Sequence, residues 1–298
     1  MRNQALKAKK QILRTQISNA RTRNNERQLQ KELSRFFARL GDKIQKNLEE
    51  YWNDTLVLGQ VELIIKPVME AQSEYYHILQ KYDKREYKLG QAEAQRLVRL
   101  SQHGYSFKAV KPKLKLDKRF SLFGTLRGAE EDLFERVFIA SQQTLARVEQ
   151  SIMTIILDGY KSGKGINYVA NQLNRRFDQL TTWESKRIAR TEIHNSHNVA
   201  VKDTYQELGV EYTMWITAHD DRVRGLKPTD QADHVELDGE IIRLGDTYSN
   251  GLKYPGDTDG PIEEWINCRC ANAPYNMPYG YTAPPQEQFR ESDIIKIK

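Results

Sequence analysis

Apolar side chains recur every three or four positions through most of the first two hundred residues, and this spacing predicts helices. Residues 1–50 contain no proline and are rich in helix formers, and their apolar positions are Leu29, Leu33, Phe36, Phe37 and Leu40. A long helix is expected there, with Gly41-Asp42 as a candidate interruption. Pro67 is expected either to break the next segment or to open a helix through Met69, Tyr76 and Leu79.

Three more amphipathic helices are predicted beyond Gly128. The first keeps one apolar face until Asp158-Gly159, where the glycine suits a helix C-terminus. The second runs from about Ile166 to Arg176. The third runs from Trp183 to Leu208, and Gly209 is expected to end it in the same way.

Alternation replaces the helical period after residue 209. Val210–Thr217 is rich in strand formers and predicts a strand. Val235–Leu237 and Glu240–Arg243 flank Asp238-Gly239, which predicts a hairpin. From Pro274 onward, prolines and tyrosines predict an extended or irregular tail. The expected fold class is α+β, with a mostly α-helical N-terminal and middle region and a small α+β C-terminal module.

Charge divides the chain more sharply than its net value of +6 indicates. Residues 1–120 contain 26 Lys and Arg against 13 Asp and Glu, and residues 121–298 contain 20 against 27. The basic stretch 111–118 around Pro112 predicts a linker, so the expected divisions are 1–120, 121–275 and a tail over 276–298. Two interpretations of the basic part stay open: solvated helices, or a surface that contacts phosphate or an acidic protein.

Composition excludes some classes of protein. No apolar run approaches the roughly 18 residues that a membrane-spanning helix needs. No apolar segment follows the first charged residues, so no secretory signal is expected. Two cysteines are too few for a disulfide scaffold and indicate a reducing compartment.

Polar side chains gather in the middle of the third helix. Arg190, Glu192 and Asn195 are expected to form buried hydrogen bonds or an interface there. His194 and His197, three residues apart, are an alternative metal pair.

Residues 215–270 hold the densest candidate chemistry. The candidate polar-core residues of this segment are Trp215, Asp221, Arg222, Arg224, His234, Asp238, Gly239, Asn267 and Arg269. In one interpretation Asp221 or Asp238 receives an arginine.

A second interpretation is a structural zinc site formed by His234, Cys268 and Cys270, with His219 or Asp220 as a fourth ligand. A third is a metal-dependent nuclease in which His234 activates water. The further His or Asn ligand that such a nuclease carries on a short helix is not evident after Cys270.

Several ordered elements together resemble the phage head morphogenesis family, the minor head proteins similar to the Mu F protein. They are Ala189–Glu192, Gly209-Val210 with Trp215, Asp221–Arg224, His234–Gly239, Tyr254–Asp257 and Ile266–Cys270. The resemblance covers roughly residues 130–275, and residues 1–120 carry no motif of their own. The sequence departs from the family pattern in two places. Gly225–Ala232 is an insertion, and Arg224 and Trp265 stand near positions where some relatives carry further zinc-type ligands, which favours the polar core over zinc.

The resemblance implies a non-enzymatic minor capsid protein of a tailed phage or prophage, without a cofactor. Its expected partners are the portal protein and capsid or scaffolding proteins, with double-stranded DNA as a further candidate through residues 1–120 and no membrane. The expected location is the virion, in the capsid interior at the portal vertex, and the host cytoplasm during assembly. The alternative is a DNA-binding protein or a metal-dependent nuclease with a His/Cys site.

Overall fold

The computed structural model describes residues 20–53, 55–102 and 122–297. The linker expected over 111–118 and the boundary expected at residue 120 lie outside these residues. The chain forms two compact units, each assembled from separated segments. We call the described residues within 25–83 and 130–189 the helical unit, and the described residues within 1–24, 84–129 and 190–298 the sheet unit. Each unit draws on both sides of residue 120, because apolar faces from both parts of the sequence pack together.

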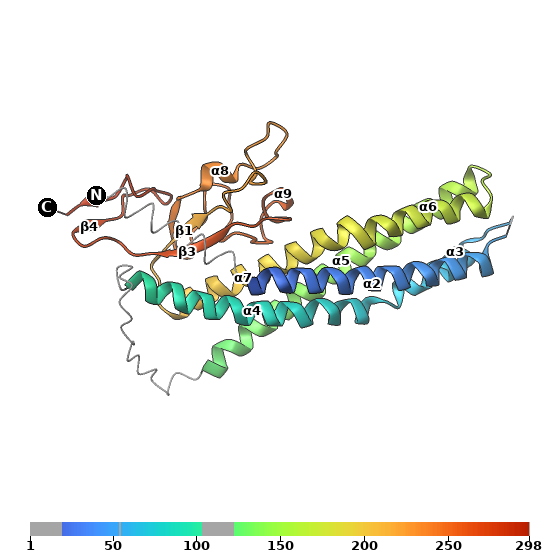
Figure 1. Cartoon of the computed structure of the whole chain (residues 1–298), viewed down its shortest axis with the longest axis horizontal. Coiled ribbons are helices and arrows are strands. Elements are labelled where there is room, and N and C mark those ends of the chain that lie inside the picture. Colours follow the sequence, from blue (N-terminus) through green and yellow to red (C-terminus); the bar gives the residue numbers. More distant parts are fainter. Residues whose placement is uncertain (1–19, 54, 103–121, 298) are drawn as a thin grey trace. The chain divides into compact units, whose positions relative to one another are not determined.

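Long helices make up the helical unit (Figure 1). In chain order they are α2 (Ala20–Tyr51), α3 (Leu58–Met69), α4 (Gln72–Gln102), α5 (Leu122–Lys161) and α6 (Ile166–Gln179), followed by the π-helical turn η1 (Leu180–Glu184); α2, α4 and α5 also contribute to the sheet unit. Phe36 and Phe37 of α2 lie 5.2 and 5.8 Å, ring to ring, from Tyr75 of α4. The helices predicted from apolar spacing are confirmed, and their shared interior is apolar.

Two of the expected helix interruptions are wrong. Helix α2 runs through Gly41. A Cβ at this position would lie 2.9 Å from the Phe177 ring of α6, so the glycine allows the two helices to pack closely. Gly159 likewise lies inside α5, against Val169 of α6. Pro67 lies within α3, and the break falls just after that helix.

The sheet unit contains most of α7 (Ser185–Glu207), which ends as expected at Gly209 with a positive φ of 66°. Its remaining elements are β1 (Tyr212–Ile216), α8 (His234–Leu237), β2 (Ile241–Arg243), α9 (Ile262–Trp265), β3 (Ala271–Tyr275), β4 (Tyr281–Thr282) and β5 (Ile295–Lys296). An antiparallel sheet of order β2-β1-β3 has the predicted strand β1 at its centre, and β4 pairs with β5. The α+β class is therefore confirmed.

Both faces of β1 are buried, and alternate side chains belong to different clusters. Tyr212, Met214 and Ile216 pack with residues that include Leu97 of α4 and Phe289. Trp215 points the other way and packs with Leu237, Ile242, Tyr248, Leu252, Cys268 and Cys270. Both cysteines therefore pack on the face of the sheet that carries Trp215.

The expected hairpin at Asp238-Gly239 is wrong. His234–Leu237 is a helical turn, because the Asp233 carboxylate accepts a hydrogen bond from the Glu236 amide and caps it. Gly239 takes a positive φ of 86° between α8 and β2, and its amide donates to the Trp215 carbonyl.

The irregular segment expected from Pro274 is also partly wrong. Pro274 lies in β3, which is an edge strand of the sheet and so tolerates a residue without an amide proton. Phe289 is buried and exchanges backbone hydrogen bonds with Ile241. Phe289 thus attaches the segment after β4 to the core.

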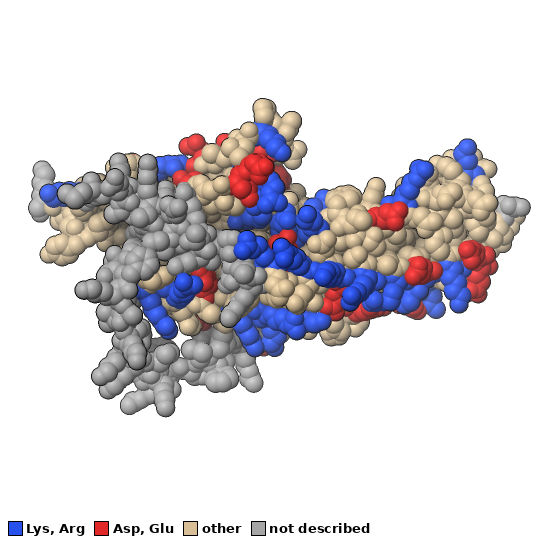
Figure 2. Space-filling view, in the orientation of Figure 1, with Lys and Arg blue, Asp and Glu red and all other residues tan. Residues whose placement is uncertain are grey.

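Exposed cations follow α2 almost every fourth residue. They are Arg23, Arg27, Lys31, Arg35, Arg39, Lys43 and Lys46, and Figure 2 shows Lys and Arg along this helix. We call these residues the basic row; Arg39 pairs with Glu74 of α4. No helix in the described part of the chain is both long and apolar enough to cross a membrane.

Candidate functional site

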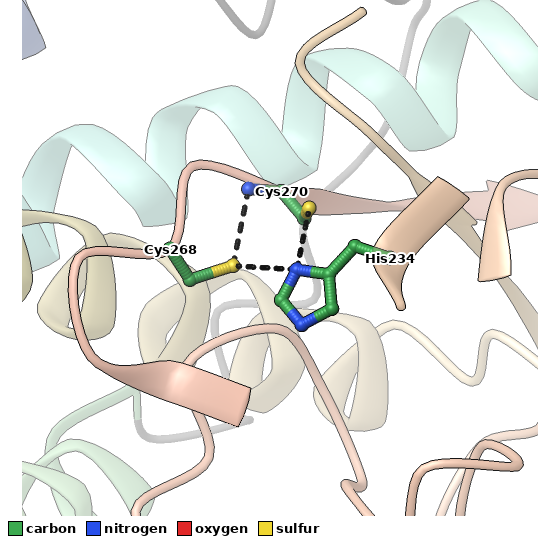
Figure 3. A group of neighbouring side chains, drawn as sticks. All are labelled: His234, Cys268 and Cys270. Carbon is green, nitrogen blue, oxygen red and sulfur yellow. Dashed lines mark hydrogen bonds between the residues drawn. The ribbon is translucent and has the colours of Figure 1, made fainter. Parts of the chain in front are cut away.

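Three potential metal ligands meet in the sheet unit (Figure 3). His234 opens α8, and Cys268 and Cys270 lie in the segment that leads into β3. Nδ1 of His234 is 3.7 Å from Sγ of Cys268 and 3.5 Å from Sγ of Cys270. All three side chains are buried, and one donor atom from each lies within 4.8 Å of the others.

Local backbone features bring these ligands together. The amides of His234 and Val235 donate to the Arg224 carbonyl at 3.0 and 3.1 Å, which fixes the start of α8. Asn267 adopts a positive φ of 55°, a conformation that asparagine tolerates better than most residues, and turns the chain into Cys268. Its amide donates to Thr191 Oγ1 at 2.9 Å, and its side chain accepts from Arg190 at 3.1 Å. Helix α7 therefore holds the turn that carries the cysteines.

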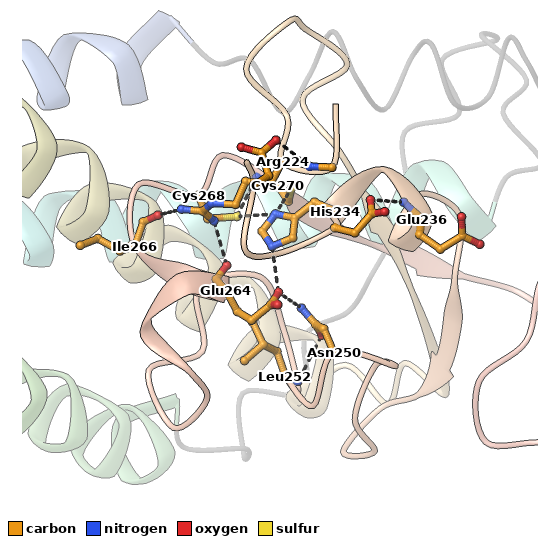
Figure 4. Close-up of polar contacts among 12 residues, drawn as sticks. Arg224, His234, Glu236, Asn250, Leu252, Glu264, Ile266, Cys268 and Cys270 are labelled. Atoms are coloured by element: carbon orange, nitrogen blue, oxygen red, sulfur yellow. Dashed lines mark hydrogen bonds and ion pairs between the residues drawn. The ribbon is translucent and has the colours of Figure 1, made fainter. Parts of the chain in front are cut away.

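A carboxylate lies behind the imidazole (Figure 4). Nε2 of His234 is 3.1 Å from Oε2 of Glu264, and Asn250 donates to the same oxygen at 2.8 Å. Trp215 meets the imidazole edge to face at 5.4 Å between ring centroids. The ring is thus fixed in place, with Nδ1 toward the thiols.

Arg224 binds the loop that precedes the cysteines. Its guanidinium donates to the carbonyl of Glu264 at 3.2 Å and also to that of Ile266. These bonds span 40 and 42 positions of sequence and link the segment before α8 to the end of α9.

Asp220, rather than the predicted Asp221, is the acidic partner of the arginines. Both of its oxygens accept from Arg269, and one also accepts from Arg222 at 3.3 Å. Hydrogen bonding to Arg269 is the main reason that the pKa of Asp220 lies far below its usual range. Asp221 is exposed.

Asp238 contacts a backbone amide and a histidine. It accepts from the Thr217 amide at 3.1 Å and lies 3.0 Å from Nε2 of His219. Neither His219 nor Asp220 joins the three ligands, so in this structure neither supplies the fourth ligand that the sequence offered.

The two thiols differ in their electrostatic environment. Hydrogen bonding to Cys270, opposed by burial and supported by His234, holds the pKa of the Cys268 thiol below its ordinary value. Burial raises the pKa of Cys270. The backbone amide of Cys270 also donates to Sγ of Cys268 at 3.4 Å.

Polar residues of α7 pack beside the same segment. Glu192 and Asn195 are buried, and Asn195 lies so close to Gly256 that a Cβ there would be 2.6 Å from its Oδ1. Asn198 donates to the Cys270 carbonyl at 3.0 Å. His197 lies 2.9 Å from Glu86, and among the described residues it is not grouped with His194 as a potential metal site.

Glu264, Asn250 and Asn198 make contacts that sequence reasoning did not assign to the site. No spacing rule connects Glu264 to His234, because their proximity depends on how α8 and α9 fold together. Asn198 carried a weak signal, since it lies one turn beyond Asn195. A small cavity of about 50 Å³ opens beside the ligands and is lined by residues that include Arg222, Arg224, Asn267 and Arg269.

The family model described as phage Mu protein F like protein matches residues 150–273. The matched segment contains His234, Cys268 and Cys270, and it confirms the resemblance over this part of the chain. No curated protein and no solved structure matches the chain.

Proposed function

We propose that this chain, which is phage Mu F-like over residues 150–273, is a minor capsid protein that assists head assembly in a tailed phage or prophage. The family match is the observation that carries the proposal. In this proposal the chain is not an enzyme, it resides in the virion, and it binds the portal protein at the portal vertex. Capsid or scaffolding proteins are further partners.

The basic row supports a contact with an acidic surface. Its cations are exposed and succeed one another along α2, so they present repeated positive charge to a partner. Such an array binds phosphate or carboxylate groups without reading a sequence. Portal protein and packaged DNA are the two partners that we propose for it.

Co-expression with the portal protein of the same phage tests the assembly role. The lysate is treated with nuclease before size-exclusion chromatography, so that DNA cannot bridge the two proteins. We expect co-elution at a fixed ratio. Separate elution of two folded proteins contradicts portal binding, and DNA cleavage that needs a metal and disappears in His234→Ala contradicts the non-enzymatic role.

A charge-reversal variant tests the basic row. In Arg27→Glu/Lys31→Glu/Arg35→Glu we expect weaker binding to duplex DNA, with the slope of log affinity against log salt reduced by about 3 if each cation meets one phosphate. The control Lys161→Glu/Lys164→Glu/Arg175→Glu changes the same charge at other exposed positions. Equal affinities for DNA in the two variants contradict a DNA contact through the row. The same two variants are then tested for binding to portal protein, and a loss confined to one partner shows which of the two the row binds.

A further inference from the structure

We propose that His234, Cys268 and Cys270 bind one zinc ion, through Nδ1 of the imidazole and Sγ of both cysteines. This zinc proposal does not depend on which partner the proposed capsid protein binds. Two sulfurs and one imidazole nitrogen are a donor set that suits Zn²⁺ and is poor for Mg²⁺ or Ca²⁺, which prefer oxygen. All three groups come from one compact unit and are buried together.

The distances between donor atoms fit a tetrahedral ion. With Zn–S of about 2.3 Å and Zn–N of about 2.0–2.1 Å, tetrahedral geometry separates a sulfur and a nitrogen by about 3.6 Å. The observed Nδ1–Sγ distances are 3.7 Å for Cys268 and 3.5 Å for Cys270. An ion would therefore require little movement of the ligands.

The surroundings prepare His234 to be a ligand through Nδ1. A carboxylate that accepts a hydrogen bond from Nε2 fixes the imidazole tautomer whose Nδ1 carries a lone pair, and Glu264 occupies that place. Asn250 donates to the same carboxylate oxygen and so helps to fix its position. Glu264 is therefore a positioning residue rather than a ligand.

The cysteines are held in a comparable way. The Cys270 amide donates toward Sγ of Cys268, an arrangement that stabilises a thiolate. Asn198 fixes the Cys270 carbonyl, and Arg224 fixes the carbonyls just before Cys268. Hydrogen bonds from α7 and from the segment before α8 thus set both sulfurs independently of a metal.

A solvent molecule would complete the zinc shell. Among the described residues, no fourth His, Cys, Asp or Glu joins the group. The adjoining cavity of about 50 Å³ has room for a water-sized ligand. Bound in this way, the ion cross-links α8 to the segment that enters β3, and it would stabilise a unit whose sheet is small.

Metal analysis and cobalt substitution test the site in the full chain. Protein purified under reducing conditions with added zinc is expected to hold one zinc per chain. After chelation and cobalt loading, we expect the visible absorption of tetrahedral cobalt and a near-ultraviolet thiolate-to-cobalt charge-transfer band. A folded protein that takes up neither metal, or a cobalt spectrum without thiolate bands, overturns the proposal.

Substitutions locate the ligands. Cys268→Ser, Cys270→Ser and His234→Asn should each lose the stoichiometric zinc and change the cobalt spectrum, whereas His219→Asn should keep both. Full zinc content in all three ligand variants overturns the assignment.

A pair of milder variants tests the zinc site even if the variants of the ligands themselves do not fold. Glu264→Gln should weaken zinc binding about 10- to 100-fold, because the carboxylate no longer orients the imidazole. Glu263→Gln, the same change one residue earlier in α9, should bind as the parent does. Equal affinities in this pair contradict the role given to Glu264, and circular dichroism shows whether both variants are folded.

Discussion

Among the described residues, the sheet unit buries many more polar side chains than the helical unit, where Asp83, Ser141 and Ser185 are among the few. The interior of the helical unit is built mainly from aliphatic and aromatic groups such as Leu33, Phe37 and Ile64, which several helices contribute. The sheet unit buries His234 and Asn195 beside its apolar clusters. Side-chain volume therefore sets the cost of a substitution in the helical unit. In the sheet unit the cost is set by the partner that a substitution leaves without a hydrogen bond.

The largest effect is expected from a cavity in the helical unit. Phe37 is fully buried, so Phe37→Ala should lower the free energy of unfolding by about 3–5 kcal/mol. Urea titration followed by circular dichroism measures this change. Lys43→Ala, an exposed position of the same helix, should stay within about 0.5 kcal/mol. Equal losses in the two variants would contradict a volume-dominated interior.

Arg224 provides the corresponding test for the sheet unit. Arg224→Ala removes charge-assisted bonds to the carbonyls of Glu264 and Ile266, and it should lower the free energy of unfolding by about 2 kcal/mol. Arg243→Ala removes an exposed pair with Glu211 and contacts with the hydroxyl and ring of Tyr212, and it should cost about 1 kcal/mol. Urea titration of both variants makes the comparison, and a smaller loss for Arg224→Ala than for Arg243→Ala would contradict the role of the loop bonds.

Gly41 provides a further test of packing in the helical unit. Alanine normally favours a helix over glycine by about 1 kcal/mol, yet a Cβ at Gly41 would crowd the Phe177 ring at a cost of about 1–3 kcal/mol. Gly41→Ala should therefore destabilise the chain by about 1 kcal/mol. Gly59→Ala in α3 meets nothing within 4 Å and should stabilise it slightly. Thermal unfolding of the two variants should show shifts of opposite sign, and a gain in both would contradict tight contact at Gly41.

The smallest effect is expected from Asp220, and it depends on pH. Its pKa is lowered in the folded chain, so the pairing with Arg269 stabilises the fold above the unfolded carboxyl pKa of about 3.9 and is lost as pH falls below that value. Asp220→Asn should lower the melting temperature at pH 7. The difference in melting temperature between the variant and the parent should be smaller at pH 3 than at pH 7. An equal difference at both pH values would indicate that the charge of Asp220 does not contribute to stability.

Sequence periodicity predicted the features that depend on residues close to one another along the chain. The long helices and the strand around Trp215 were predictable because their apolar spacing extends over many residues. The His/Cys group could be foreseen as a candidate because histidine and cysteine, which are typical zinc ligands, are rare in this sequence.

The remaining features depend on contacts between distant segments. Asp233 caps a helical turn where alternation predicted a strand, and Glu264 reaches His234 only after α8 and α9 have folded. Asp220 and Asp221 are adjacent acids, and only the path of the backbone decides which one meets Arg269. The interleaved units have the same cause, since apolar faces do not specify which distant partner covers them.

The interleaving also sets an order of events during synthesis on the ribosome. Glu86 is buried against His197, and 111 positions separate the two residues. At about 5–20 residues per second, on the order of ten seconds pass between the synthesis of Glu86 and that of His197. Phe289, which completes one side of the sheet, is translated later still. The helical unit can therefore assemble once residue 189 has been made, whereas the sheet unit is complete only after Phe289 has been made.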